Sequence, residues 1–86
     1  MAPEIVTSPH PDVQIPDVSL HELVLADAGR RADAPALVDG PSGRTLTYGQ
    51  LAGGVRRVAA GLAARGFAKG DVFAIHSPNV PEYALA

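Results

Sequence analysis

Few residues in this sequence have the types and spacing that chemistry at a protein site requires. The three histidines, His10, His21 and His76, share no metal-ligand spacing, and no carboxylate pair is arranged to join them. The chain has no cysteine, which excludes disulfides, thiolate metal sites and cysteine nucleophiles. We therefore expect no metal centre among these side chains.

His76 and Ser77 have the most suggestive position, because they follow the apolar run 72–75. The carboxyl ends of parallel strands line ligand clefts in α/β folds, so this pair would face a ligand if the run is such a strand. A polar pair at a strand end is more often solvated or bonded to backbone, and we favour that interpretation. Ser77 also lacks the Gly-x-Ser-x-Gly frame of a nucleophile.

Two glycine pairs could be mistaken for phosphate-binding loops. Gly40-Pro-Ser-Gly43 lacks a following lysine and a helix start at the required spacing, so the pattern favours a hairpin turn. Gly66-x-x-x-Gly70 is interpreted as a helix stop followed by a turn.

A cationic edge late in the chain's long helix comprises Arg56, Arg57, Arg65 and Lys69. Solvation and a favourable interaction with the carboxyl end of the helix explain it without a ligand.

Composition excludes several classes of protein. The 86 residues carry 7 Lys+Arg against 9 Asp+Glu, so the basic surplus of a nucleic-acid-binding module is missing. Aromatic residues make up only 5% of the chain, which leaves few large anchors for an independent core. The amino terminus lacks the cationic start and apolar run of a signal peptide, and no stretch approaches the roughly 18 apolar residues of a membrane helix. We expect a cytoplasmic protein with no membrane span.

The first third of the chain predicts a tail and a helix. Four prolines within residues 1–18 indicate an extended, proline-rich tail. Ser19 and Glu22 have the spacing of a capping box, and apolar residues at helical spacing predict a helix through about Arg31. Asp33-Ala-Pro35 should end it.

The middle of the chain is the best specified. The β-prone runs 36–39 and 44–47, separated by turn formers, predict a hairpin. Thr47 and Gln50 form a second capping box, which should open a long helix with an apolar stripe of Leu51, Val55, Val58 and Leu62. Gly66 suits the left-handed position of a Schellman ending, with Phe67 folding back on Leu62. Small residues allow close packing of this helix on a sheet: Gly49, Ala52, Gly53 and Ala60.

The last residues predict half of a parallel unit. The continuous apolar run 72–75 suits a strand covered on both faces. Asn79 and Glu82, with Pro81 in the first turn, resemble a helix start. A parallel strand needs a neighbour that this chain does not supply. We therefore expect an α/β fold in incomplete form: helix, β-hairpin, long helix, parallel-type strand and the start of a further helix.

Residues 15–86 resemble the amino-terminal part of the adenylate-forming, or AMP-binding, superfamily. Leu46-Thr-Tyr48 opening a long helix, with a closing glycine and Lys69-Gly-Asp71, is similar to the superfamily at large. Features that resemble more narrowly the branch of 4-coumarate–CoA ligases and related acyl-CoA synthetases are Ile15-Pro-Asp-Val-Ser-Leu-His-Glu22, Arg57-Val-Ala-Ala-Gly-Leu62 and Pro78-Asn-Val-Pro-Glu82.

The resemblance implies a two-step ligase that uses ATP, Mg²⁺ and coenzyme A to convert a carboxylic acid into a thioester. In this family the phosphate loop, the adenine motif, the ribose-binding aspartate and the carboxy-terminal lysine lie downstream of the matched region. We therefore assign no catalytic, cofactor-binding or metal-binding residue here, and expect residues 19–86 to be a truncated, structural portion of the ligase domain. The remainder of that domain would be its partner.

Two alternatives stay open. The parent could be another adenylate-forming enzyme, luciferase-like or a peptide-synthetase adenylation domain, because the residues that select substrate are not in this segment. The chain could also be a stand-alone, non-catalytic interaction module descended from such a segment, in which case it should fold alone.

Overall fold

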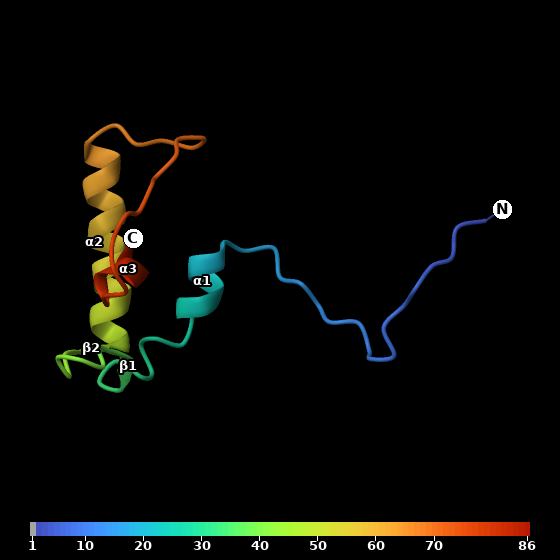
Figure 1. Ribbon diagram of the computed structural model, residues 1–86, viewed down its shortest axis with the longest axis horizontal. Helices are drawn as coiled ribbons and strands as arrows, with labels where there is room; N and C mark the ends of the chain where they lie inside the picture. Colours follow the sequence, from blue (N-terminus) through green and yellow to red (C-terminus); the bar gives the residue numbers. More distant parts are fainter. Residues whose placement is uncertain (1) are drawn as a thin grey trace.

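The computed structural model describes residues 2–86 and contains three helices and one two-stranded sheet in that range (Figure 1). The elements follow in the order α1 (Leu20–Leu25), β1 (Pro35–Val38), β2 (Thr45–Thr47), α2 (Tyr48–Ala64) and α3 (Glu82–Leu85). The long helix α2 is the element on which the hairpin and α3 both pack. The mixture of helices with a small sheet makes the chain a partial α/β fold.

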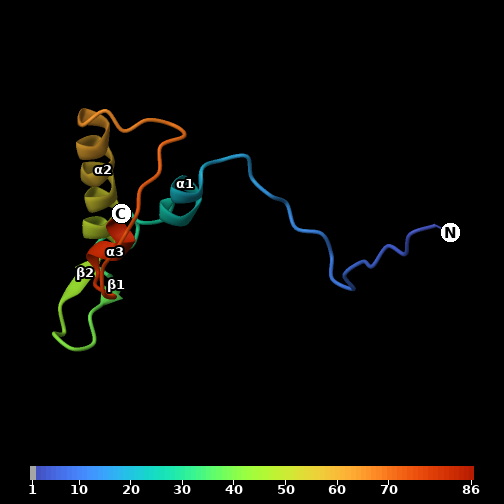
Figure 2. The ribbon, with the colours of Figure 1, turned by 45° about the horizontal axis from the view of Figure 1, so that its top comes forward.

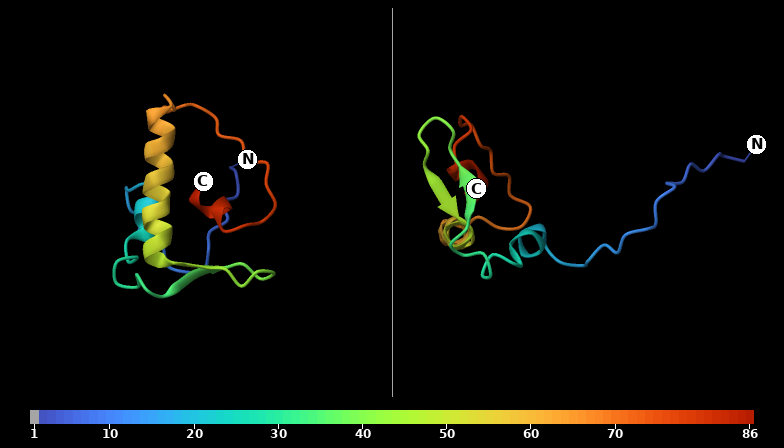
Figure 3. Two further views of the ribbon diagram at one scale, coloured as in Figure 1. Left: turned by 90° about the vertical axis from the view of Figure 1, so that its left-hand side faces the viewer. Right: turned by 90° about the horizontal axis from the view of Figure 1, so that it is seen from below.

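Residues 2–18 run away from the remainder of the chain without forming a helix or a strand (Figure 3). Their four prolines restrict the backbone to extended conformations, and apolar residues such as Ile5 and Ile15 are almost fully exposed. The predicted tail, 1–18, begins at Met1, which lies outside the described residues.

Helix α1 is shorter than predicted. It ends at Leu25 rather than near Arg31, and Ser19 makes no side-chain capping hydrogen bond. Tight turns follow, in which Ala28 and Arg31 donate to carbonyls three residues back, at 3.0 and 3.2 Å. Gly29 lowers helix propensity within this stretch, and α1 buries none of its own residues. Little therefore stabilises a longer helix.

The hairpin forms as predicted, except that β1 lies one residue earlier than 36–39 and β2 begins one residue later than 44. Strands β1 and β2 pair antiparallel, Leu37 opposite Leu46 and Val38 opposite Thr45, with an irregularity nearer Pro35. Gly43 in the connection has a φ of 73°, a left-handed conformation that glycine adopts without a Cβ clash.

The capping box at the start of α2 is confirmed. The Thr47 hydroxyl accepts a hydrogen bond from the Gln50 N–H at 3.2 Å, and the Gln50 side chain accepts one from the Thr47 N–H at 2.9 Å. Two backbone donors that the helix leaves without partners are thereby bonded. The predicted apolar stripe, residues 51, 55, 58 and 62, is half-buried along the helix.

The Schellman ending of α2 is also confirmed. The Phe67 N–H donates to the Leu62 carbonyl and the Gly66 N–H to the Ala63 carbonyl, both at 3.0 Å. Gly66 has a φ of 89°. The helix therefore stops because glycine takes the left-handed position at which the chain turns away.

Close packing on α2 uses only some of the predicted small residues, Gly49 and the buried Ala52, together with Gly54, which was not predicted. A Cβ at Gly54 would lie 2.7 Å from Leu85 of α3, and one at Gly49 would lie 3.2 Å from the Ala32 carbonyl oxygen. Gly53 faces open space, and Ala60 is exposed. Gly53 and Ala60 were therefore wrongly predicted as packing positions. Figure 2 shows α3 lying against α2 near the hairpin.

The predicted strand at 72–75 is not formed. Within residues 2–86 the sheet contains only β1 and β2, so no neighbouring strand supplies hydrogen bonds to this segment. Val72 is 90% exposed, whereas the Phe73 ring lies edge-on to Phe67 with 6.2 Å between centroids. Through Phe73 the apolar run therefore contacts Phe67, three residues after the end of α2.

The last helix begins later in the sequence than predicted. Helix α3 begins at Glu82, with Pro81 rather than Asn79 at the cap position, and no side chain caps it. Pro81 has a helical φ of −56° and is buried, so it leads directly into the first turn.

Replacing Gly66 by alanine should shorten or destabilise α2, because a Cβ is strained at a φ of 89°. We expect a loss of about 1 kcal/mol in helix stability, measured as weaker circular dichroism at 222 nm. The matched control is Gly61→Ala, in the exposed interior of α2 with nothing within 4 Å of the new methyl group. It should strengthen the same signal. Equal effects of the two variants would contradict the assigned role of Gly66.

Candidate functional site

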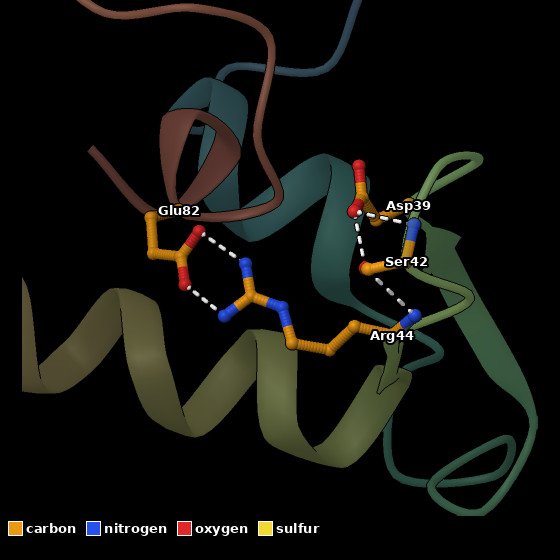
Figure 4. Close-up of polar contacts among 4 residues, drawn as sticks. All are labelled: Asp39, Ser42, Arg44 and Glu82. Atoms are coloured by element: carbon orange, nitrogen blue, oxygen red, sulfur yellow. Dashed lines mark hydrogen bonds and ion pairs between the residues drawn. The ribbon is translucent and has the colours of Figure 1, made fainter.

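The polar cluster of this chain consists of Asp39, Ser42, Arg44 and Glu82 (Figure 4). The first three belong to the β1–β2 connection, and Glu82 is the first residue of α3. The Arg44 guanidinium donates to both carboxylate oxygens of Glu82, at 2.5 and 2.7 Å. This bidentate geometry is the strongest form of an arginine–carboxylate pair. It joins segments 38 residues apart in sequence.

The hairpin side of the cluster organises a turn. The Asp39 carboxylate accepts hydrogen bonds from the Ser42 hydroxyl and from its N–H, and the Ser42 hydroxyl oxygen accepts one from the Arg44 N–H at 3.2 Å. A nucleophilic serine needs a base that can take its proton, usually a histidine. Ser42 has a carboxylate partner within an exposed turn. The arrangement therefore supports the turn and not nucleophilic chemistry.

The charges of the ion pair stabilise one another. Hydrogen bonding to Arg44 is the main reason that the pKa of Glu82 lies below its ordinary value of 4.5, and the backbone adds to the effect. The hydrogen bond to Glu82 likewise raises the pKa of Arg44. Both side chains are about half exposed, so the surrounding water screens the attraction. The contact positions α3 without a large net energy.

The structure does not bring the histidines together. His21 lies on α1 and His76 in the extended segment before α3, and His10 is in the tail. Among residues 2–86, no group of three His, Asp or Glu side chains could hold a metal ion. The Ser77 hydroxyl donates a hydrogen bond to the Pro78 carbonyl at 2.9 Å. This agrees with the favoured interpretation, in which the polar residues at 76 and 77 are solvated or bonded to backbone.

The glycine loops have structural roles. In the loop from Gly40 to Gly43, the Ser42 N–H already donates to a carboxylate, whose charge would repel a phosphate. Gly66 ends α2, and Gly70, with a φ of 94°, lies in a turn closed by a bond from the Ala68 N–H to the Asp71 carboxylate at 2.8 Å. The cationic residues 56, 57, 65 and 69 are all exposed.

An apolar groove of about 430 Å³ lies among the three helices. Most of its lining is aliphatic: Leu20, Val24 and Leu25 of α1, Leu51 and Val55 of α2, and Leu85 of α3. Leu20 is 76% exposed and Val24 67%, so water reaches side chains that would be more stable when covered. Such a surface suits contact with further protein and offers few polar groups to orient a small ligand.

Sequence reasoning missed the Arg44–Glu82 pair and the Gly54–Leu85 contact. Opposite charges at positions 44 and 82 were visible, but so were many other combinations among 16 charged residues. Gly54 carried no signal that distinguished it from Gly53. Only the path of the chain after Gly66 brings α3 back to these positions.

The family model for the AMP-binding enzyme matches residues 24–86, which is most of the chain. The chain belongs to this family. The match begins within α1 and includes the hairpin, α2 and α3. The resemblance seen in the sequence is thereby confirmed.

Several relatives agree on the branch of the family. The chain is 40% identical over 77 residues to 4-coumarate–CoA ligase 5 of Oryza sativa subsp. japonica, which is 88% of this chain and 14% of the relative. It is 36% identical over 83 residues to 4-coumarate–CoA ligase 1 of Petroselinum crispum, which is 95% of this chain and 15% of the relative. The chain thus spans about one-seventh of the length of these relatives. No solved structure matches it.

Membership in this family implies that the parent protein binds a nucleotide. The described residues, 2–86, contain no group of side chains suited to hold one. They offer no phosphate cradle, since the hairpin loop presents a carboxylate, and no carboxylate cluster for a divalent cation. No step of a reaction is therefore assigned to these residues. None of the helices in the described part of the chain is long and apolar enough to cross a membrane.

We expect Arg44→Gln to raise the pKa of Glu82 towards 4.5, because the substitution removes the largest cause of its lowering. The folded-state pKa is lowered, so the pair contributes at pH values above 4.5 and is lost as pH falls through the lowered pKa. Carboxyl ¹³C chemical shifts of Glu82 across an acid titration measure this directly. Arg57→Gln removes the same charge from an exposed position of α2 and should leave the titration unchanged. Identical titrations in the Arg44 variant and the unsubstituted chain would contradict the pairing.

Proposed function

We propose that this chain is the amino-terminal segment of an ATP-dependent carboxylate–CoA ligase of the 4-coumarate–CoA ligase type. The observation that carries the proposal is identity of 36 to 40% with relatives of that name over most of the chain, together with the family match over residues 24–86. Because the chain spans 14 to 15% of those relatives, the reaction is proposed for a longer parent protein.

In the proposed parent, a carboxylate attacks the α-phosphorus of Mg-ATP, forming an acyl-adenylate and releasing pyrophosphate. The thiol of coenzyme A then attacks the acyl carbon and displaces AMP, which leaves the acyl-CoA thioester. The parent would use ATP, Mg²⁺, coenzyme A and a carboxylic acid in a cytoplasmic setting. Phosphate cradling and cation binding would come from residues outside this segment, and we propose no catalytic, cofactor-binding or metal-binding residue within it.

The role proposed for this segment is structural. Residues 19–86 would form a truncated portion of the ligase domain, and residues 1–18 a proline-rich tail before it. The apolar groove and the exposed side chains of Val72, Phe73 and Ile75 support this role, because further protein surface would cover them. The remainder of the ligase domain is the proposed partner.

Two observations disfavour a stand-alone interaction module. Ala28 and Ala52 are the only hydrophobic residues buried among those described, so no large side chain anchors a core. Leu20 and Val24, which line the apolar groove, are 76% and 67% exposed, whereas a chain that folds alone would be more stable with such side chains covered. If the chain were such a module, it would unfold in urea with a cooperative transition. That result would contradict the proposed segment.

Sequencing the coding DNA beyond codon 86 tests the parentage. The proposal expects a continuing reading frame that encodes a Ser/Thr/Gly-rich loop ending near a lysine. An immediate stop codon would overturn it as a statement about this protein. A continuing frame with motifs of a luciferase-like or peptide-synthetase enzyme would favour that branch instead.

The purified 86-residue chain should show no acid-dependent exchange of pyrophosphate into ATP, because its residues provide no phosphate-binding loop. The assay supplies 4-coumarate, Mg-ATP and labelled pyrophosphate, and an active 4-coumarate–CoA ligase serves as the positive control. Measurable exchange by the 86-residue chain would place the chemistry within this segment and contradict the structural role.

A further inference from the structure

Helix α3 is too short to be stable by itself. It has four residues and no side-chain cap, whereas isolated helices in water need roughly 12 to 15 residues to persist. Residues 65–81, which connect it to α2, form neither a helix nor a strand. Tertiary contacts must therefore hold α3 where it lies.

Contacts at both ends of α3 provide that support. At its carboxyl end, Leu85 packs on Gly54, where the missing side chain leaves room for it. At its amino end, Glu82 receives both hydrogen bonds from Arg44 of the hairpin. The apolar contact fixes the distance of α3 from α2. The ionic contact fixes its direction, because a planar guanidinium bonded to both carboxylate oxygens restricts their mutual orientation.

The geometry points to Arg44 and Glu82 as an ionic latch that holds α3 on α2 and so keeps Leu85 in place as part of the wall of the apolar groove. The groove takes its third wall from Ala84, Leu85 and Ala86, directly after the latch. Releasing Glu82 leaves α3 held by apolar contacts, among them Leu85 on Gly54 and the buried Pro81. This inference does not depend on the proposed ligase parent.

Charged and polar groups near the latch affect its strength. Asp39 is the other charged group that acts on Arg44, and it stays on the hairpin side, bonded to Ser42. Glu82 lies in the first turn of α3, where the helix end also favours a negative charge. Because the pair is half exposed, added salt should weaken it.

The nuclear Overhauser effect between the Gly54 α-protons and the Leu85 methyl groups reports whether α3 lies on α2. We expect the effect in the unsubstituted chain, and a fall of roughly twofold in both Arg44→Gln and Glu82→Gln, in keeping with an exposed ion pair. Salt at 0.5 M should lower the nuclear Overhauser effect of the unsubstituted chain towards that of the variants. The double variant Arg44→Glu with Glu82→Arg should recover part of the effect lost in either reversal alone.

Arg57→Gln is the matched control, since it removes one cation from an exposed position of α2 and should leave the effect unchanged. The latch is overturned if both neutral variants keep the full effect, if the paired reversal recovers none of it, or if the unsubstituted chain shows no contact between Gly54 and Leu85. An equal fall in Arg57→Gln would attribute the change to net charge and would also overturn the pairing.

Discussion

The hydrogen bonds at the two ends of α2 determine where the rest of the chain can go. At the start, Thr47 and Gln50 bond to each other's backbone directly after β2, so the hairpin and the helix meet at a fixed residue. At the end, Gly66 turns the chain back through a left-handed conformation. The hairpin and α3 then both pack on the helix between these points. Without either end, the remaining contacts would lose their common support.

The second constraint is the scarcity of buried apolar surface. Burial of large aliphatic and aromatic side chains supplies most of the free energy that opposes chain entropy. Here the buried hydrophobic residues among those described are two alanines, while aliphatic side chains line an open groove. Local hydrogen bonds and the long-range ion pair between Arg44 and Glu82 therefore contribute much of the organisation. This pattern agrees with a chain that belongs to a family whose matched relatives are about seven times longer.

Several polar side chains of the chain take part in turns and local hydrogen bonds. Asp39 and Ser42 shape the hairpin turn, Asp71 closes the turn after α2, and Ser77 bonds to backbone. Each of these side chains has a partner within three residues, so its hydrogen bonding is already satisfied locally. The Arg44–Glu82 pair is the exception, because its residues lie 38 positions apart in sequence, and it positions a helix. These contacts agree with the proposal that the ligase reaction of the parent uses residues outside this segment.

The sequence by itself determined the features that depend on near neighbours. The hairpin, the capping box at Thr47 and the Schellman ending at Gly66 involve residues within a few positions, so their residue types are sufficient to predict them. The family could also be predicted from the sequence, because its motifs are short runs of consecutive residues. The length of α1, the absence of a strand at 72–75 and the start of α3 at Glu82 were decided by tertiary structure. A helix lengthens only when packing stabilises it, and a strand exists only with a hydrogen-bonded neighbour. The Arg44–Glu82 and Gly54–Leu85 contacts likewise arise only when the folded chain brings distant residues together.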